Sequence, residues 1–513
     1  MTITEIKKQQ CEKTLYHYLK EHAEHTPEKI WLSSEREAVT FREALGRVES
    51  AAMQFLECGM KKGDLLALRA TRCIDTVLLA VAAASVGAVA ALTDAHFPVV
   101  TYLRETGVKM TPDFILTNEE AGEGISAGGN WKLSGGGATE DITFRADGDR
   151  EALEAVAKTV RADEPFMIIF TSGSTGTSKA VLLSHKNCVA NPADAMPLFG
   201  QGPSDVAIAL LPLNHVFGFA VAACSLFCGH GLFFPQNIDI EYILQCIEQR
   251  RISVIYAVPT FFLELLKDGR NRKYDLSSLR LGLMAGGPFT AEQMRFIEGE
   301  LGLRLMPGYG MSECVGISTS NFDAPVEERA AGVGKLYPMT EAFVMGEDGQ
   351  HLRCGEEGEI CVRGMTLMLG YYGDEAATRE VIDRDGFLHT GDLGYFDADG
   401  TLYISGRKKD IIIRSGNNIS TVGVEKKIMS LPCVYTASVV GIQDAKSTEA
   451  PAAMVVLKTG CVCTEGELLR EMESVLTRLE LPVKVMIVPS LPLTSSGKPD
   501  KQKIKAMLEE AGS

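Results

Sequence analysis

Residues 168–179 read Ile-Ile-Phe-Thr-Ser-Gly-Ser-Thr-Gly-Thr-Ser-Lys. The apolar run from Phe166 to Phe170 before this loop predicts a buried strand, and the run from Ala180 to Leu183 predicts a second strand after it. The loop between them offers backbone N–H groups, hydroxyl donors and one ammonium group, with little bulk. Such a set of groups suits a polyphosphate. The candidate phosphate-binding residues are Thr171, Ser172, Gly173, Ser174, Thr175, Gly176 and Lys179.

The same loop is not a Walker loop. Lys179 does not directly follow a glycine, and Ala180 supplies no hydroxyl for a metal ion. A flexible Gly/Ser hairpin without a ligand is therefore the alternative, and the rest of the chain must decide between the two.

Length and charge narrow the class of protein. A chain of 513 residues is too long for one compact core, so two or more domains are expected. The net charge of −16 argues against a nucleic-acid-binding surface. It also means that an anionic substrate such as ATP needs a local basic site, because the overall field repels it.

The cysteines and the N-terminus bear on the compartment. There are 13 cysteines and no Cys-x-x-Cys pair, which disfavours a disulfide framework or a zinc site and favours a reducing cytoplasm. The first residues lack the apolar core of a signal peptide. The segment from Val77 to Leu92 is short and interrupted by Ser85 and Gly87, so we expect a buried helix and strand there and no transmembrane segment.

The loop at 171–179 resembles the phosphate loop of the acyl-adenylate-forming superfamily, which includes acyl-CoA synthetases, peptide-synthetase adenylation domains and beetle luciferases. That family usually has Pro-Lys-Gly where this chain has Ser178-Lys179-Ala180. The resemblance runs from about residue 14 to about residue 505, with five motifs in the family's order.

Strand and helix patterns alternate after the loop, which predicts an α/β architecture with mostly parallel sheets. Beyond Lys409 the pattern changes to short strands and two helices, typical of a small α+β domain. We therefore expect a large N-terminal AMP-binding domain at 1–408 and a small mobile C-terminal domain at 409–513, and the resemblance implies that Lys409 is the hinge between them.

The Gly- and Ser-rich stretch from Ala121 to Arg150 is expected to be a surface loop. Helices are expected at 14–24, 42–56, 216–227, 240–249, 290–301, 424–430 and 465–478, and strands at 65–68, 206–211, 253–257, 279–284, 402–404, 411–414, 437–441 and 453–457.

Three motifs of the large domain resemble nucleotide-binding and acyl-binding segments of the family. Leu211 to Gly218 resembles the segment that lines the acyl pocket, which makes His215 a gate of that pocket. Ala285-Gly286-Gly287-Pro288 resembles a turn whose backbone edges the adenine, and glycines permit that approach. Pro307 to Glu313 resembles a motif that implies adenine stacking by Tyr309, α-phosphate contact by Ser312 and Mg²⁺ binding by Glu313, a hard oxygen ligand. The nucleotide-binding residues implied here are Gly286, Gly287, Pro288, Tyr309, Gly310 and Ser312.

The remaining motifs lie on both sides of the proposed hinge. The block from Thr390 to Ile413 is the most specific match, and it implies that Asp392 accepts the ribose hydroxyls and that Arg407 contacts the nucleotide. Ser415-Gly416 would approach the pantetheine of coenzyme A, and Lys498 would be the catalytic lysine. The chain departs from the family at the thiol-acceptor surface, where Thr421, Gly423 and Thr448 replace common proline, glutamate and glycine residues.

The acyl pocket is predicted to be apolar. Relatives that activate amino acids usually place an aspartate where this chain has Leu213-Asn214-His215. An unpaired ammonium group would be costly to bury in such a pocket, so the substrate is expected to be an apolar carboxylic acid. The pocket residues inferred from the resemblance are Val216, Phe219, Cys314, Val315 and Gly316.

The resemblance implies a two-step acid–thiol ligase. A fatty or aryl carboxylic acid would react with ATP in the presence of Mg²⁺ to give an acyl-adenylate, and coenzyme A would then take the acyl group. His215, Glu313 and Lys498 are the predicted catalytic residues. An enzyme that loads a separate carrier protein remains an alternative. A non-catalytic nucleotide-binding relative is disfavoured, because it should have lost Lys498, Glu313 or Asp392.

Overall fold

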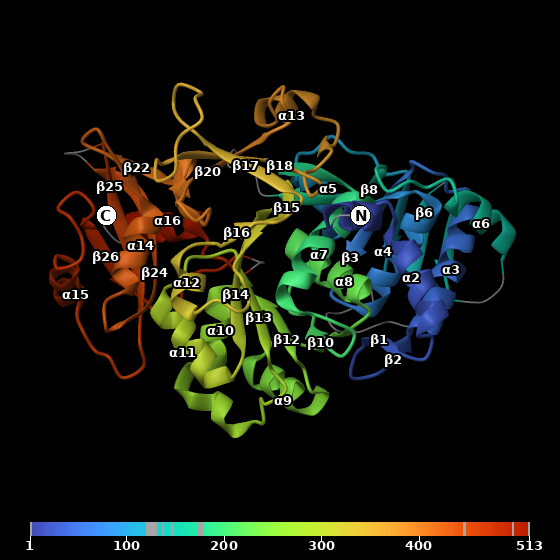
Figure 1. The fold of residues 1–513 in the computed structure, drawn as a ribbon, viewed down its shortest axis with the longest axis horizontal. Helices are drawn as coiled ribbons and strands as arrows, with labels where there is room; N and C mark the ends of the chain where they lie inside the picture. Colours follow the sequence, from blue (N-terminus) through green and yellow to red (C-terminus); the bar gives the residue numbers. More distant parts are fainter. Residues whose placement is uncertain are drawn as a thin grey trace.

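The computed structural model describes residues 3–118, 131–135, 138–144, 148–171, 178–444, 448–494 and 497–510. Figure 1 shows the C-terminal elements, in orange and red, on the opposite side of the molecule from the blue N-terminal elements. Five of the predicted phosphate-loop residues lie outside the described residues, namely Ser172, Gly173, Ser174, Thr175 and Gly176.

The first sheet carries the two strands that flank the phosphate loop. Its strand order is β19-β9-β8-β4-β3-β5-β6-β7, and β8, β4, β3 and β5 run parallel to one another, whereas the outer strands β9 and β6 pair with them antiparallel. These central strands are continuous apolar runs because both faces of the sheet are covered. The bounds are β3 Leu65–Ala70, β4 Val89–Asp94, β5 Phe114–Thr117, β6 Trp131–Gly135, β7 Ala138–Ile142, β8 Pro165–Thr171, β9 Lys179–Ser184 and β19 Gly370–Tyr371.

The second sheet supplies most of the strands around the candidate site. Its order is β16-β15-β14-β13-β12-β10-β11-β1-β2, and the strands from β14 to β1 in this order are parallel. Parallel strands bring their carboxyl ends to one edge, where sites form. The bounds are β1 Ile30–Ser33, β2 Ala38–Thr40, β10 Val206–Ile208, β11 Gly231–Phe233, β12 Val254–Ala257, β13 Leu281–Ala285, β14 Arg304–Met311, β15 Cys314–Thr319 and β16 Lys335–Leu336.

Most helices of the large domain pack through buried apolar faces, whereas α13 has no buried residue and α12 buries only Arg329. Thr40 and Glu43 form a capping box that starts α3. Every residue of α4 is buried, which explains why this segment is apolar on all sides. The bounds are α1 Ile3–Gln10, α2 Leu15–His25, α3 Phe41–Glu57, α4 Ile74–Val86, α5 Val99–Glu105, α6 Arg150–Ala157, α7 His185–Phe199, α8 Val216–Cys228, α9 Ile240–Arg250, α10 Pro259–Leu266, η1 Lys267–Lys273, α11 Ala291–Leu301, α12 Val326–Ala331 and α13 Glu375–Val381.

A four-stranded antiparallel sheet, β17-β18-β20-β21, leads to the C-terminal domain. Its last strand ends at Arg407, and a short 3₁₀ turn, η2 Lys408–Asp410, joins it to the first strand of the C-terminal sheet. This turn contains the predicted hinge, and the domain boundary at 408/409 stays a prediction. The bounds are β17 Thr340–Met345, β18 Gly358–Gly364, β20 Leu388–Phe396 and β21 Leu402–Arg407.

The C-terminal domain has its own core, in which α14 and α15 pack on a mainly antiparallel sheet. Thr464 caps α15 through a capping box with Glu467. The bounds are β22 Ile411–Arg414, β23 Asn417–Ser420, α14 Thr421–Met429, β24 Val434–Asp444, β25 Thr448–Leu457, α15 Glu465–Met472, β26 Lys484–Ile487 and α16 Lys501–Glu510. A large α/β domain followed by a small C-terminal domain was the predicted fold, and it is confirmed.

Three local predictions are corrected. Part of the expected surface loop at 121–150 forms the strands β6 and β7, in which Trp131 and Leu133 alternate with more exposed residues and are buried. Helix α15 ends at Met472, before the expected end at Arg478. Strand β10 ends at Ile208, before the expected end at Leu211.

Within the described residues, none of the helices has the length and apolarity needed to cross a bilayer.

Candidate active site

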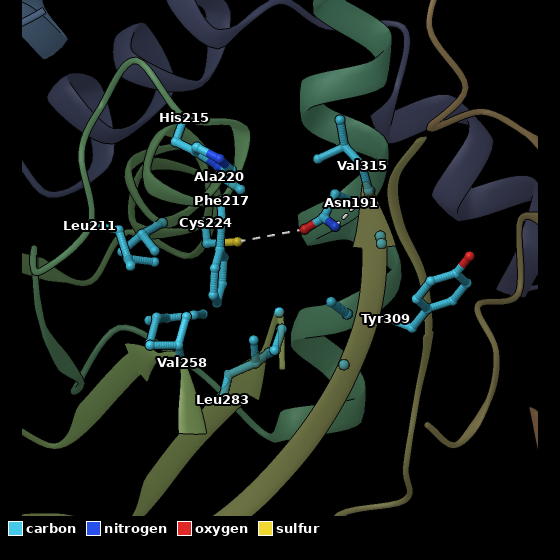
Figure 2. A pocket seen from close by; sticks show the side chains of 18 of the residues that line it. Asn191, Leu211, His215, Phe217, Ala220, Cys224, Val258, Leu283, Tyr309 and Val315 are labelled. Carbon is cyan, nitrogen blue, oxygen red and sulfur yellow. Dashed lines mark hydrogen bonds between the residues drawn. The ribbon is translucent and has the colours of Figure 1, made fainter. Parts of the chain in front are cut away.

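A cavity of about 110 Å³ lies between α7, α8, the carboxyl ends of β12 and β13, and the β14–β15 hairpin (Figure 2). Its walls are mainly apolar, and among the described residues that line it Lys498 is the charged side chain. The other lining residues are Asn191, Ala195, Met196, Phe199, Leu211, Pro212, His215, Phe217, Ala220, Val221, Cys224, Tyr256, Val258, Leu283, Ala285, Gly286, Gly308, Tyr309, Gly310, Val315, Gly316 and Tyr337.

Helix α8 forms one wall of the cavity. Phe217, Ala220, Val221 and Cys224 follow helical spacing and line the cavity. The ring of Phe217 stands nearly perpendicular to that of Tyr256, with centroids 6.4 Å apart. Figure 2 shows Phe217 and His215 on the side of the cavity that faces Val258 and Leu283.

The residues Val216 and Phe219, predicted for the acyl pocket, do not line this cavity. Both are buried, and the ring of Phe219 packs on that of Phe166 with centroids 5.7 Å apart. The helix is apolar on every side, so the sequence pattern does not reveal which face meets the cavity.

The β14–β15 hairpin forms the opposite wall. Val315 and Gly316 line the cavity, whereas Cys314 does not, and its Sγ lies 3.3 Å from Thr366 Oγ1. Asn191 of α7 holds the hairpin by donating to the Val315 carbonyl at 2.7 Å. Gly316 has a φ of +84°, and a Cβ there would lie 2.1 Å from Asn191 Nδ2. Only glycine fits this close approach.

Tyr309, Asp392 and Arg407 form a connected polar group beside the cavity. The Tyr309 hydroxyl donates to Asp392 Oδ2 at 2.6 Å, and Arg407 Nε donates to Asp392 Oδ1 at 2.7 Å. Asp392 and Arg407 are register partners on β20 and β21, so the antiparallel ladder places them side by side. Burial and the Asp392 charge raise the pKa of Tyr309 well above its ordinary value. The phenol is therefore a neutral hydrogen-bond donor.

Lys498 reaches this site from the C-terminal domain. A Cβ on Gly286 would lie 2.7 Å from Lys498 Cε, so the lysine stem packs directly on the glycine backbone. The loop that carries it is closed by a hydrogen bond from Thr494 N to the Lys498 carbonyl at 2.8 Å. Burial lowers the pKa of Lys498, the charge of Arg407 lowers it further, and Asp392 opposes them. Two domains thus contribute to one site.

His215 lies at the start of α8 and lines the cavity. Burial lowers its pKa to about 4, and the nearby charge of Lys498 acts in the same direction. The imidazole is therefore neutral near pH 7, and it can shape or gate the cavity without adding charge.

Glu313 and Lys179 lie close to one ring, that of Tyr371. The Tyr371 hydroxyl donates to Glu313 Oε1 at 3.0 Å, and Lys179 Nζ lies 4.5 Å from the ring centroid. Thr171 and Lys179 are register partners at the ends of β8 and β9, and they bracket residues 172–177. The base of the predicted phosphate loop therefore lies near the predicted metal ligand.

Sequence analysis missed Tyr371, Asn191 and Tyr256 as parts of the site. Tyr371 belongs to a strand of two residues that pairs with β9, and Asn191 lies in the middle of α7. No local motif marks these residues, because only the pairing of distant segments brings Asn191 and Tyr256 to the cavity and Tyr371 to Glu313.

The other predicted residues occupy turns. Gly287 and Pro288 follow Gly286 between β13 and α11, and Ser312 is buried between β14 and β15. Ser415 and Gly416 form an exposed turn between β22 and β23, with φ of 50° and 79°. Lys409 lies in η2 and is exposed.

Comparisons with known proteins agree with this architecture. Residues 19–372 match the model of the AMP-binding enzyme family, and residues 423–498 match that of the AMP-binding enzyme C-terminal domain. The putative acyl-CoA synthetase YngI of Bacillus subtilis (strain 168) is 34% identical over 384 residues, which are 74% of this chain and 70% of that protein. The mitochondrial medium-chain acyl-CoA ligase ACSF2 of Macaca fascicularis is 32% identical over 368 residues, 70% of this chain and 60% of that relative.

Among solved structures, the o-succinylbenzoate coenzyme A synthetase MenE from Bacillus subtilis, in complex with ATP and a magnesium ion, has a TM-score of 0.77 and 25% identity. The similarity covers 96% of this chain and 100% of that chain. The family match spans both domains that meet at Lys498. The chain therefore belongs to the AMP-binding enzyme family, as an AMP-forming acid–thiol ligase.

Proposed function

We propose that this protein activates an apolar carboxylic acid with ATP and transfers the acyl group to coenzyme A. The observation that carries the proposal is the position of Lys498, whose ammonium group enters an apolar cavity beside Gly286 and near the Tyr309–Asp392–Arg407 group. A carboxylate in this cavity would meet one cation and mainly apolar walls.

In the first step a carboxylate oxygen bonds to the α-phosphorus of ATP, and the bond from that phosphorus to the pyrophosphate oxygen breaks. Both reactants are anions, so the barrier is largely electrostatic. Lys498 is proposed to stabilise the negative charge on the α-phosphate, with Ser312 as a hydroxyl donor. Thr171 and Lys179, with the loop between them, would hold the departing pyrophosphate.

The adenosine is assigned to the polar group beside the cavity. Asp392 is 3% exposed and already accepts two hydrogen bonds, so its carboxylate is fixed where ribose hydroxyls could replace or join these donors. Tyr309 offers a ring for the adenine, and the backbone of Gly286, Gly287 and Pro288 offers a flat edge.

Glu313 fits the role of a magnesium ligand. Its carboxylate is half-buried and oriented by Tyr371, and among the ion pairs of the described residues none involves Glu313. Mg²⁺ is commonly held by one or two carboxylates together with substrate phosphates and water. When bound, the ion would neutralise phosphate charge. Glu313 would be its protein ligand, and the ammonium group of Lys179 would lie nearby at the base of the phosphate loop.

In the second step the thiol sulfur of coenzyme A bonds to the acyl carbon, AMP leaves, and the thiol proton passes to solvent or to a base. Ser415 and Gly416 are proposed to approach the pantetheine after the C-terminal domain rotates about Lys409. Such a rotation would withdraw Lys498 from the cavity, so that one domain serves both half-reactions.

An apolar acid is favoured by the cavity walls. Among the described residues that line the cavity, none is an aspartate or glutamate that could pair with an α-ammonium group. Burying an unpaired ammonium there would cost several kcal/mol, whereas each buried CH₂ would contribute roughly 0.8 kcal/mol. The relative from Macaca fascicularis is named for medium-chain acids, which supports the same class.

The test is a panel of straight-chain acids, aryl acids and matched amino acids. The first step is measured as ATP–pyrophosphate exchange in the presence of Mg²⁺. The second step is measured as thioester formation in reactions that contain coenzyme A, compared with reactions that lack it. We expect exchange with apolar acids and a thioester with free coenzyme A. No exchange over the panel would refute the activity, a preference for a free amino acid would refute the substrate class, and exchange without thioester formation would favour a separate carrier protein.

A further inference from the structure

The apolar cavity contains a small group of uncharged polar side chains. Asn191, Cys224, Tyr256 and Tyr337 all line it, and the last three residues are at most 4% exposed. Figure 2 shows the Asn191 amide pointing toward Cys224, whose thiol makes a weak contact of 3.9 Å with Asn191 Oδ1. The proposed reaction uses none of these four residues.

The polar group lies deeper in the cavity than Lys498. A Cβ on Gly286 would lie 2.7 Å from Lys498 Cε and 3.6 Å from Val258, so the lysine stem and Val258 lie at the same end. Tyr256 precedes Val258 by two residues along β12 and lines the same cavity. Two residues of extended chain span about 6–7 Å. A carboxylate held at Lys498 would therefore direct its tail toward the polar group.

Asn191 and Tyr337 have hydrogen-bonding capacity that the protein does not use. Asn191 Nδ2 donates one of its two hydrogens to the Val315 carbonyl at 2.7 Å, and Oδ1 receives only the weak thiol contact. The Tyr337 hydroxyl makes no hydrogen bond with any other described residue. The Gly316 backbone brings the two together, because a Cβ there would lie 2.1 Å from Asn191 Nδ2 and 2.7 Å from Tyr337 Cε2.

An alkyl tail would match this part of the cavity poorly. It would displace water from the Asn191 amide and the Tyr337 hydroxyl and offer no hydrogen bond in return, which leaves buried polar atoms unpaired. The Tyr256 hydroxyl already donates to Gln201 Oε1 at 2.6 Å, so its oxygen can only accept a further hydrogen bond. The unused donor is therefore Tyr337, and the unused acceptor is Asn191 Oδ1.

The charge state of the polar group excludes a second anion on the acid. Burial raises the pKa values of Tyr256 and Tyr337, and the nearby Cys224 acts in the same direction. Burial also raises the pKa of Cys224 well above its ordinary value. All three are neutral near pH 7, and among the described lining residues the one cation, Lys498, is assigned to the reacting carboxylate. A second anionic group would be buried without a cation, which is costly.

We propose that the preferred acid carries one hydroxyl group on its tail, which donates to Asn191 Oδ1 and accepts a hydrogen bond from the Tyr337 hydroxyl. The proposal rests on the proposed function, because it specifies the acid that the same cavity takes. A hydroxyl group both donates and accepts, so it satisfies the two unused groups at once, whereas a carbonyl or ether oxygen would satisfy only the donor. The rest of the tail is apolar, as the other cavity walls require.

The first test compares pairs of acids that differ only by a hydroxyl and a methyl group at one position. A length series of straight-chain acids with a terminal hydroxyl covers alkyl tails, and hydroxybenzoic and methylbenzoic acids of each substitution pattern cover aryl tails. In ATP–pyrophosphate exchange, kcat/KM of the hydroxyl member should exceed that of the methyl member by about tenfold or more at one position, because only that member pairs the buried groups. Equal or lower values for the hydroxyl member at every position would overturn the proposal.

Tyr337→Phe removes the hydroxyl donor and keeps the ring beside Gly316. The preference for the hydroxyl member should fall by about tenfold, while kcat/KM of the methyl member is retained. Tyr18→Phe is the matched control, because it removes a buried hydroxyl of α2 that donates to the Gln10 carbonyl at 2.9 Å, outside the cavity lining. Its preference should equal that of the wild type. An equal loss for both members in Tyr337→Phe would make Tyr337 a packing residue and refute its proposed role.

A second readout needs no catalysis. The melting temperature of the full chain is measured with AMP and each member of every pair. The hydroxyl member of the preferred pair should raise it more than the methyl member in the wild type and in Tyr18→Phe, and this difference should vanish in Tyr337→Phe. The difference without any adenylation would refute the proposed reaction and keep the hydroxyl site. Adenylation of apolar acids without the difference would keep the reaction and refute the hydroxyl site.

Discussion

Single residues of the site owe their chemistry to burial and to one or two charged neighbours. Lys498 lies between apolar walls near Arg407, and its pKa is lowered, whereas a surface lysine keeps its ordinary value. Asp392 is almost fully buried but is paired with a guanidinium group and a phenol, so it keeps two fixed acceptor oxygens. The same residue types in solvent would have neither property.

Lys498→Ala should slow adenylation by on the order of 10²–10³, because a positioned cation is lost from the transition state. Thioester formation from preformed acyl-adenylate should persist, since Lys498 is expected to be withdrawn in that step. The two half-reactions are measured separately, with the exposed Lys503→Ala as the control. Equal loss in both half-reactions would contradict the separate role of Lys498.

The pH profile of adenylation should show the lowered pKa of Lys498. The ammonium form is the one that stabilises anionic charge, so the rate should fall as pH rises through a value below the ordinary 10.5. In Lys498→Arg the guanidinium stays charged, and the fall of any remaining activity should move to higher pH. An identical alkaline limb in both proteins would assign the titration to another group.

Asp392→Asn should weaken ATP binding. The amide keeps an acceptor oxygen but loses the charge-assisted hydrogen bonds, which are worth about 1.5–3 kcal/mol. We expect KM for ATP to rise on the order of tenfold to hundredfold, with a smaller change in kcat. Asp399→Asn, in the exposed turn after β20, should leave KM unchanged. A loss confined to kcat would place Asp392 elsewhere in the reaction.

At the scale of elements, α8 shows why one face of a helix carries specificity. Phe217, Ala220, Val221 and Cys224 meet the cavity, while Val216 and Phe219 complete the protein core. Small Ala220 leaves space in the cavity wall, and its neighbours on the same face are larger. The length of acid that fits should therefore depend on this position.

Ala220→Phe should shorten the preferred acid. The added ring occupies cavity volume, so kcat/KM for the longest accepted straight-chain acids should fall by roughly tenfold or more, while short acids are retained. Phe219→Leu, on the opposite face, should lower thermal stability and leave the chain-length profile unchanged. The comparison requires kcat/KM over a length series and a melting temperature for each variant. A parallel loss for all acids in Ala220→Phe would indicate general misfolding of the helix.

At the scale of the whole molecule, the contacts between the two domains include polar pairs, Lys498 and the ring of Tyr435, which packs against the apolar core of the large domain. Gln293 Nε2 donates to the Tyr435 carbonyl at 3.2 Å, and Thr459 Oγ1 donates to Asp268 Oδ1 at 3.1 Å. The polar contacts can be exchanged for water at little cost, so apart from the Tyr435 ring and Lys498 these contacts offer little resistance to a domain rotation.

Lys409→Pro tests that rotation. Proline fixes φ near −65°, which suits a turn but resists a change in backbone direction. Adenylation should remain largely intact, and transfer to coenzyme A should be blocked. Lys409→Ala serves as the control, because it removes the side chain and keeps backbone freedom. Normal overall turnover in Lys409→Pro would argue against a hinge at this residue.

The order of the motifs and the two-domain α/β fold could be predicted from the sequence alone. The apolar strands at Phe166–Phe170 and Ala180–Leu183 and the capped helices are encoded by neighbouring residues, through periodicity and capping. The segment from Thr390 to Ile413 likewise carries its ladder partners Asp392 and Arg407 in one continuous stretch. Their role in nucleotide binding is implied by the family resemblance and stays a prediction.

The shape of the acyl cavity and the contacts of Asn191 and Tyr371 were decided only by tertiary structure. Val216 and Phe217 are neighbouring apolar residues on α8. The local sequence pattern does not indicate which of them faces the cavity, because that depends on the strands packed against the helix. Asn191 meets Val315, and Tyr371 meets Glu313, across large separations in the chain. Local patterns determine which elements form, whereas the pairing of distant strands determines which side chains meet.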